Sequence, residues 1–215
     1  MKYTKTLSMV QLALFSALIM LLATVPYIGY IKVPFLAIQA TTIHIPVIVG
    51  SILLGPKAGA FLGAVFGLTS LINNPTQPGI TSFCFSPFIQ MGEGLGGSPL
   101  ALIICFVPRI LCGVIPHYVF HGVQKLTKDP GRTRKRSLLL AGVAGSMTNT
   151  LLVMSMIYLF FGQAYAAARN IAYEAILGVI GSVILINGTI EAIVAALIAS
   201  AVALAMMRAR LIKTE

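Results

Sequence analysis

Charged side chains are scarce in this sequence, and tryptophan is absent. Only 9% of the 215 residues are Asp, Glu, Lys or Arg, whereas 58% are hydrophobic. A soluble domain needs a far more polar surface, so this composition excludes a water-soluble globular protein. The mean hydropathy of +0.95 favours a chain whose solvent is lipid.

The sequence also lacks the usual catalytic and metal-binding motifs. Gly55-Pro-Lys57-Ala has neither the spacing nor the hydroxyl residue of a phosphate-binding loop, so we expect no ATP hydrolysis by that route. There is no G-x-S-x-G elbow and no pair of membrane carboxylates, and we therefore predict that the chain is not an enzyme and needs no cofactor. The three cysteines form no C-x-x-C pair, and His117 and His121 have no third acidic ligand nearby, so we predict no metal site.

Hydrophobic segments fill nearly the whole length of the chain. They predict an all-α integral membrane protein that forms a single membrane domain over residues 1–215. Six transmembrane helices are expected at approximately residues 7–26, 37–54, 57–73, 100–125, 138–161 and 176–207. The second and third are short for a span of about 20 residues, so a re-entrant pair with four crossings in total is the alternative.

Basic residues are confined to a few places, which predicts the orientation. Lys2 and Lys5, the loop 125–136 and the tail 208–213 should all be cytoplasmic by the positive-inside rule. Both termini are then cytoplasmic, and we prefer six crossings because Lys57 also faces the cytoplasm in that topology. Topology therefore explains the net charge of +10 better than binding to nucleic acid does.

The longest predicted non-helical stretch, Asn73 to Pro99, lies on the external side in this topology. It is rich in turn-forming residues, and its three phenylalanines can pack inward, as in a lid. It provides Asn73 and Phe85 as candidate ligand contacts. The shorter external loop from Tyr27 to Thr42 has a similar composition.

Small residues recur on three helix faces: Gly55, Gly59, Gly63 and Gly67; Ala13, Ser16 and Ala17; and Ala192, Ala196 and Ser200. The glycine face predicts a tight contact between helices, because its members have no side chains to keep another backbone away. Internal packing is the ordinary interpretation of all three faces.

Polar side chains occur inside apolar segments, where each ionisable group costs about 2.5 to 3.5 kcal/mol on insertion scales. At 1.5 Å per residue, Arg109 and Glu191 lie about 15 Å below the external surface, Asn149 about 18 Å and Asn187 about 9 Å. We predict that these residues form one layer and line a ligand pocket near the external face, which His44 approaches. An ion pair between Arg109 and Glu191, with no ligand, is the alternative.

Five motifs follow one another along the chain: Ala13-Leu-Phe-Ser-Ala17, Ile45-Pro-Val-Ile-Val-Gly-Ser-Ile-Leu-Leu-Gly-Pro-Lys57, Phe85-Ser-Pro-Phe88, Val107-Pro-Arg-Ile-Leu-Cys-Gly113 and Asn187-Gly-Thr-Ile-Glu-Ala192. With them the sequence resembles the S subunits of energy-coupling factor (ECF) vitamin transporters over essentially its whole length. Within that family, Thr41-Thr-Ile-His-Ile-Pro46 and the Pro108-Arg109 helix look most like the pantothenate-specific branch.

The resemblance implies a multi-pass protein of the bacterial cell membrane whose ligand site is closed by the first, third and fifth loops. It also implies docking, through the face of Ala13, Ser16 and Ala17, onto a membrane coupling subunit that carries two ATPases. Those partner subunits would hydrolyse the ATP that drives uptake.

The leading hypothesis is capture of a small carboxylate-bearing vitamin, with pantothenate expected. Arg109 would bind the carboxylate, because a guanidinium offers a forked pair of donors, while Asn149, Asn187 and Glu191 take hydroxyl or amide groups. Riboflavin, folate and other vitamins remain alternatives, although the lack of tryptophan disfavours a large flat aromatic ligand. A self-sufficient carrier that uses Glu191 to bind the coupling proton is the second hypothesis.

Overall fold

The computed structural model describes residues 2–25, 28–33, 38–89, 98–126 and 130–209. Its elements are α1 (Lys2–Thr24), β1 (Tyr30–Val33), β2 (Ile38–Thr41), α2 (His44–Leu54), α3 (Pro56–Thr76), η1 (Ser82–Cys84), α4 (Leu100–Leu126), α5 (Pro130–Ala168), η2 (Tyr173–Ala175), α6 (Ile176–Val183), η3 (Ile184–Gly188) and α7 (Thr189–Arg208). Because α6, η3 and α7 are continuous, the described residues contain six helices, and the predicted all-helical fold is confirmed at that level. Among them, four stretches are long and apolar enough to cross a membrane: Lys5–Thr24, Leu100–Leu126, Thr133–Ala168 and Tyr173–Arg208.

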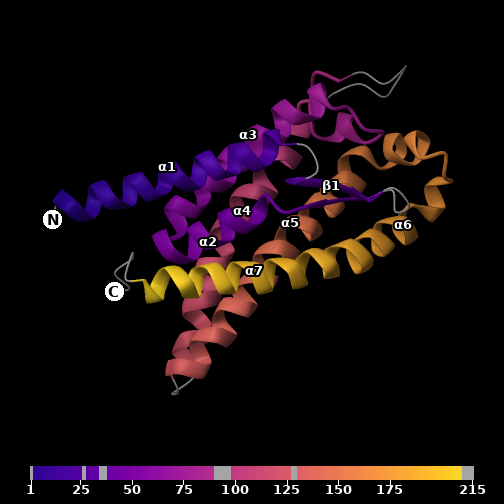
Figure 1. The fold of residues 1–215 in the computed structure, drawn as a ribbon. Coiled ribbons are helices and arrows are strands. Elements are labelled where there is room, and N and C mark those ends of the chain that lie inside the picture. The colour runs from indigo at the N-terminus through magenta and orange to yellow at the C-terminus, as the bar shows by residue number, and fades with distance from the viewer. Residues whose placement is uncertain (1, 26–27, 34–37, 90–97, 127–129, 210–215) are drawn as a thin grey trace.

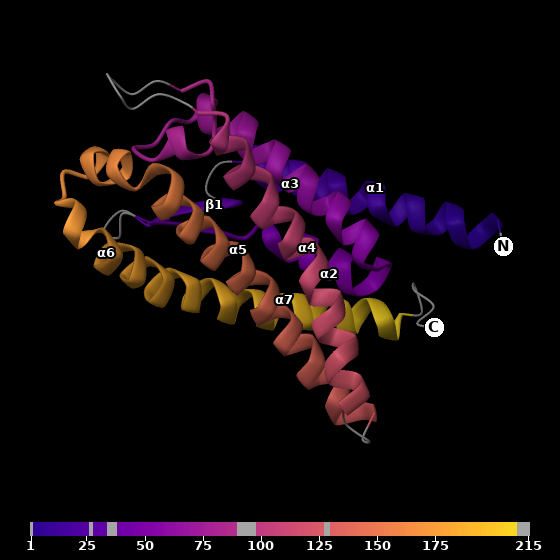
Figure 2. The same ribbon diagram turned by 180° about the vertical axis from the view of Figure 1, so that it is seen from behind.

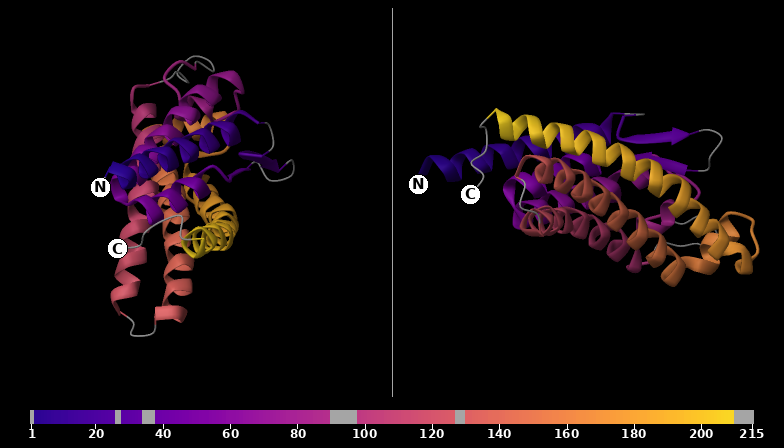
Figure 3. Two further views of the ribbon diagram at one scale, coloured as in Figure 1. Left: turned by 60° about the vertical axis from the view of Figure 1, so that its left-hand side comes forward. Right: turned by 90° about the horizontal axis from the view of Figure 1, so that it is seen from below.

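The helices form a bundle with two distinct ends (Figures 1 and 2). α1 begins and α7 finishes at one end, whereas the α3–α4 and α5–α6 connections lie at the other. α2 is enclosed by α1, α3, α4, α5 and α7, and every residue from His44 to Ile52 is buried, as expected for a helix that is apolar on all sides. The last turns of α4 and the first turns of α5 project together from the bundle as a helical hairpin (Figure 3).

The predicted helix at 37–54 is wrong at its start, because α2 begins only at His44. Residues Ile38–Thr41 instead pair with Tyr30–Val33 in an antiparallel ribbon in which Tyr30 is opposite Thr41. Both strands are rich in β-branched residues, which favour extended backbone. Apolarity alone does not distinguish such a short strand from the first turns of a helix.

The predicted non-helical stretch from Asn73 is also wrong at its start, because α3 continues to Thr76. Pro75 has no N–H to donate within the helix. The Asn74 side chain donates to the Ser70 carbonyl at 2.8 Å, and the Thr76 hydroxyl donates to the Asn73 carbonyl at 3.0 Å. These bonds keep the last turn helical; residues 90–97 of the following loop lie outside the described part.

α5 extends well beyond the predicted span of 138–161 at both ends. It begins at Pro130, a residue suited to the first helical position, and the helix continues through the basic residues that follow. The backbone at Phe161 leaves helical geometry (φ −130°, ψ 16°), so the predicted end of the span coincides with a kink. Residues 127–129 and 210–215, part of the predicted cytoplasmic charge, lie outside the described residues.

The predicted glycine contact is confirmed for three of its four members, which lie against α4: Gly59, Gly63 and Gly67. A Cβ at Gly59 would collide with the carbonyl oxygen of Gly113, and one at Gly63 with that of Arg109. The prediction is wrong for Gly55, which has open space around it and a φ of +94° between α2 and α3. Glycine suits that position because it tolerates positive φ.

The two alanine faces differ from each other. Ala192 and Ala196 are buried, and a Cβ added to Gly142 of α5 would lie 2.6 Å from the Ala196 Cα atom, so these two members pack internally as predicted, whereas Ser200 is only half-buried. Ala13 and Ala17 are exposed instead. The expectation of internal packing is therefore wrong for this face, because α1 buries the face that carries Phe15 and Ile19.

Candidate functional site

Buried apolar side chains form two clusters, one toward each end of the bundle. The cluster that we call terminus-side contains Phe15, Ile19, Ala23, Ile43, Ile45, Val47, Ile48, Val49, Ile52, Leu62, Phe66, Cys112, Phe120, Leu138, Ala141, Ala195, Ala199 and Ala203. The loop-side cluster contains Phe83, Cys84, Ala101, Ile104, Val153, Met154, Ile157, Phe161, Tyr165, Ala166, Ile176 and Ile180. The 3₁₀ turn η1 contributes Phe83 and Cys84, so the long loop closes the loop-side cluster.

A layer of buried polar side chains separates the two clusters. It comprises Arg109 on α4, Asn149 and Thr150 on α5, Asn187 on η3, Glu191 on α7 and, from α2, His44; we call these six residues the polar layer. On α4, for example, Ile104 belongs to the loop-side cluster and Cys112 to the terminus-side cluster, with Arg109 between them. Each of the six side chains is at most 9% exposed, so their polar atoms need partners other than bulk water.

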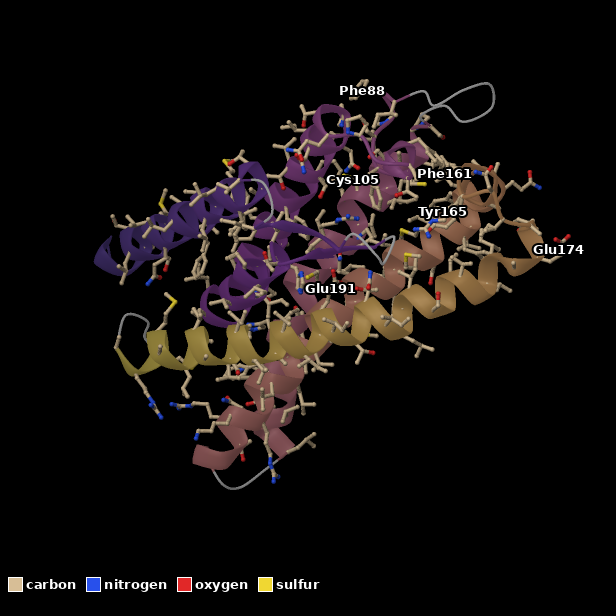
Figure 4. All side chains as sticks on the ribbon, turned by 45° about the vertical axis from the view of Figure 1, so that its right-hand side comes forward. Phe88, Cys105, Phe161, Tyr165, Glu174 and Glu191 are labelled. Carbon is tan, nitrogen blue, oxygen red and sulfur yellow. The ribbon has the colours of Figure 1, made fainter. Side chains whose placement is uncertain are left out.

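Glu191 links three other elements at the centre of the molecule (Figure 4). One carboxylate oxygen accepts the backbone N–H of Thr41 from β2 at 2.7 Å, and the other accepts the hydroxyl of Thr150 from α5 at 3.1 Å. The Thr41 hydroxyl in turn lies 3.3 Å from Nδ1 of His44. The ribbon, α2, α5 and α7 therefore meet in one hydrogen-bonded chain.

Arg109 contacts aromatic side chains of both clusters. One guanidinium nitrogen donates to the Ile104 carbonyl at 2.6 Å, and the guanidinium carbon lies 5.1 Å from the centre of the Phe85 ring and 5.5 Å from that of Phe66. Aromatic faces attract a cation at such distances. Among the described residues no ion pair joins Arg109 to Glu191, so the ion-pair alternative is not formed.

Three atoms of the polar layer are buried without a hydrogen-bond partner among the described residues. They are Nε2 of His44, Nε of Arg109 and Oδ1 of Asn149. Buried polar atoms are nearly always paired, so each unpaired atom calls for an explanation such as a ligand or water. Other atoms of this kind lie on Ser51, His117, Thr133 and Ser146, outside the layer.

Asn187 occupies a wide turn of its helix. Residues Ile184–Gly188 form a π-helical segment, a rare geometry that often marks functional sites. A Cβ at Gly188 would lie 3.2 Å from the Thr150 methyl group, so this turn lies against the same part of α5 as Glu191. Asn187 therefore belongs to the layer by position, one turn before Glu191.

The other predicted contacts lie nearer the loops. Phe85 reaches Arg109, whereas no hydrogen bond among the described residues joins Asn73 to the polar layer; Asn73 lies half-buried near the end of α3. Sequence reasoning missed Thr41 and Thr150, which contact Glu191, and Phe66, which contacts Arg109. Thr150 adjoins Asn149 and so carried a signal in the sequence, but a backbone donor such as that of Thr41 carries none.

The described residues offer no obvious metal site. His117 and His121 bring their ring centres to 4.3 Å, near the hairpin end of α4. No group of three His, Cys, Asp or Glu side chains in the described part of the chain is placed to hold an ion.

The family model for the substrate-specific component of ECF transporters matches residues 7–203, almost the whole chain. The chain belongs to this family. Two relatives of this substrate-specific component agree with that membership. The "Pantothenic acid transporter PanT" of Lactococcus lactis subsp. cremoris is 35% identical over 210 residues, 98% of each chain. The "Pantothenate transporter PanT" of Leuconostoc mesenteroides subsp. mesenteroides is 28% identical over 204 residues, 94% of this chain and 93% of the relative.

Membership confirms the resemblance inferred from the sequence motifs. An ECF substrate-specific component is a transporter subunit rather than an enzyme, and the family implies substrate binding and association with an ECF module. The several long apolar helices agree with a multi-pass membrane protein. These points are independent of which substrate this ECF component binds.

Proposed function

We propose that this ECF component captures a small carboxylate-bearing vitamin, pantothenate first of all, from outside the bacterial cell membrane for ATP-driven uptake. The observation that carries the proposal is the polar layer, in which buried atoms of His44, Arg109 and Asn149 have no hydrogen-bond partner in the described part of the chain. The names of the two PanT relatives agree with this substrate.

The chemistry of the layer matches the groups of pantothenate, which has a carboxylate, an amide, two hydroxyls and a compact apolar centre. Arg109 would bind the carboxylate, with Phe66 and Phe85 holding the guanidinium in place. Asn149, with His44 and Asn187, would take the amide and hydroxyl groups. Glu191 and Asn73 also belong to the proposed site: Glu191 lies within the polar layer, and Asn73 would contact the ligand from the loop side.

The proposed topology puts the loop side of the bundle outside the cell and both termini in the cytoplasm, in a single membrane domain. Six crossings include α2, although its 11 residues span only about 16 Å at 1.5 Å per residue. The ribbon that precedes α2 extends that crossing toward the loop side, and its non-helical backbone is acceptable there because the protein provides hydrogen-bond partners.

For transport we propose docking onto a membrane coupling subunit that carries two ATPases, which hydrolyse the ATP. The exposed face of Ala13 and Ala17, with Ser16 half-buried beside them, is the surface proposed for that contact. Small residues allow a partner helix to approach closely within a membrane.

The test is equilibrium binding to the purified full-length protein, with pantothenate, riboflavin and folate compared side by side. Pantothenate should bind most tightly, and Arg109→Ala should weaken its binding by at least about 30-fold, the effect of truncating one partner of a buried charge pair. Arg134→Ala, at an exposed position on the hairpin, is the control and should leave the affinity unchanged. Unaltered binding by Arg109→Ala would remove Arg109 from the site.

The alternative function, a self-sufficient proton-coupled carrier, predicts a different result when the same purified protein is placed in vesicles. Vesicles that contain only this protein would take up the vitamin under a pH gradient if Glu191 carried a coupling proton. We expect no such uptake, and we expect transport only when ATP and the partner subunits are added. Uptake by the protein alone would contradict the ATP-driven function.

A further inference from the structure

We infer that Glu191 is a latch that fastens the β1–β2 ribbon onto α5 and α7 over the proposed vitamin site. In this role Glu191 is a positioning residue, and its main partners belong to the protein. The inference deepens the proposed function, because it assigns the closing of that site to one carboxylate.

The first argument is that both carboxylate oxygens already have partners. The Thr41 N–H and the Thr150 hydroxyl bind one oxygen each, at 2.7 and 3.1 Å. Hydrogen bonds to an ionised acceptor are roughly twice as strong as neutral ones. His44, Arg109 and Asn149 differ in that each retains a buried atom with no hydrogen-bond partner within the described ranges, which makes them the better ligand contacts.

The second argument is that the ribbon presents the Thr41 N–H in the right direction. Successive N–H groups of an antiparallel strand point to opposite sides. The N–H of Thr42 donates to the Gly29 carbonyl on the β1 side at 3.0 Å, so that of Thr41 turns away from β1 and reaches Glu191. An edge N–H at this depth needs an acceptor from the protein, and Glu191 is that acceptor.

The third argument is that releasing the latch also affects a ligand contact. The Thr41 hydroxyl lies 3.3 Å from Nδ1 of His44, whose Nε2 is one of the unpaired atoms of the polar layer. Movement of the ribbon away from Glu191 therefore changes the position of the imidazole. Closure of the ribbon therefore also fixes the position of the His44 side chain.

Hydrogen exchange of the ligand-free full-length protein tests the latch directly, since residues 38–42 contain the Thr41 amide. Glu191→Ala should raise exchange in this segment on the order of tenfold to a hundredfold, the effect of losing hydrogen bonds to a charged acceptor. Glu191→Gln should raise it much less, because the amide oxygen still accepts the Thr41 N–H. The matched control is Glu174→Ala, since Glu174 is an exposed carboxylate at the far edge of the molecule (Figure 4), and it should have no effect.

Thr150→Val keeps the shape of the side chain, removes only one donor and should raise exchange of residues 38–42 by a smaller factor. This variant replaces Glu191→Ala as the test if Glu191→Ala does not fold. In every variant, hydrogen exchange within α4 reports whether the helix bundle is intact. A change of less than about twofold in residues 38–42, for either variant with α4 still protected, overturns the latch.

Pantothenate dissociation from the same proteins separates this inference from the proposed function. Glu191→Ala should speed dissociation about tenfold or more, whereas Arg109→Ala should weaken binding and leave exchange of the ribbon unchanged. If the wild type binds no pantothenate but Glu191→Ala still frees the ribbon, the proposed substrate is wrong and the latch stands. If pantothenate binds and the ribbon is unaffected, only the latch is wrong.

Discussion

Gly63→Ala places a methyl group where α3 and α4 are closest and thereby tests how Arg109 is positioned. The added Cβ would collide with the Arg109 carbonyl oxygen and lie 2.8 Å from the Ile110 Cα atom. Ordinary carbon contacts are about 3.5–4.0 Å, so the two backbones must separate by roughly 1 Å. Overpacking of this kind costs about 1–3 kcal/mol.

Gly122→Ala is the matched control, because Gly122 lies on α4 with nothing within 4 Å of an added Cβ. Both variants gain the helix propensity of alanine, so their difference isolates the packing effect. For a chain of this size, about 1–3 kcal/mol corresponds to melting temperatures that differ by roughly 2–12 °C, with Gly63→Ala the lower.

A thiol-reactive dye provides the assay, because Cys84, Cys105 and Cys112 are all buried until the bundle unfolds. Pantothenate affinity should also fall about tenfold or more in Gly63→Ala, since a shift of about 1 Å misplaces the guanidinium. The reasoning is refuted if Gly63→Ala melts at or above Gly122→Ala, because the glycine contact would then be loose enough to accept a methyl group.

Two further predictions concern the surface of α1 and the loop. Ala13→Trp or Ala17→Trp should leave pantothenate binding intact and prevent co-purification with the coupling subunit; a complex that survives both substitutions would place docking elsewhere. Phe83→Ala should lower stability by about 3–5 kcal/mol, because the fully buried ring packs edge-on against Phe161 at 5.9 Å. Thermal unfolding measures this loss, and Phe88→Ala, at a ring that is 79% exposed, should show little of it.

Counting residues along apolar segments was enough to group the polar positions. The rise of an α-helix is fixed, so distance along the chain gives depth for Arg109, Asn149 and Glu191, which the structure places between the same two apolar clusters. Glycine spacing likewise predicted a tight helix contact, and the structure shows that its partner is α4. Both inferences rely on helical geometry that side chains scarcely alter.

The hydrogen-bond partners of those residues could not be predicted from the sequence. Opposite charges at similar depth suggested an ion pair, yet Arg109 donates to the Ile104 carbonyl and Glu191 accepts from a backbone N–H. That N–H is available only because residues 38–41 form a strand, which an apolar pattern does not separate from a helix. The end of α3 was missed for a similar reason, since side-chain bonds from Asn74 and Thr76 hold its last turn.

The separate partners of Arg109 and Glu191 have a consequence for ligand affinity. In a buried ion pair, an incoming carboxylate must first displace the partner of the arginine, and separating such a pair costs about 3–5 kcal/mol. Here the guanidinium is held by a carbonyl and two aromatic rings, and its Nε has no hydrogen-bond partner among the residues that the structure describes. If Arg109 binds the vitamin carboxylate as proposed, no salt bridge among the described residues has to break first. Under the same proposal the Glu191 carboxylate stays bonded to the ribbon, so anion binding and closure of the ribbon would not compete for the same charge.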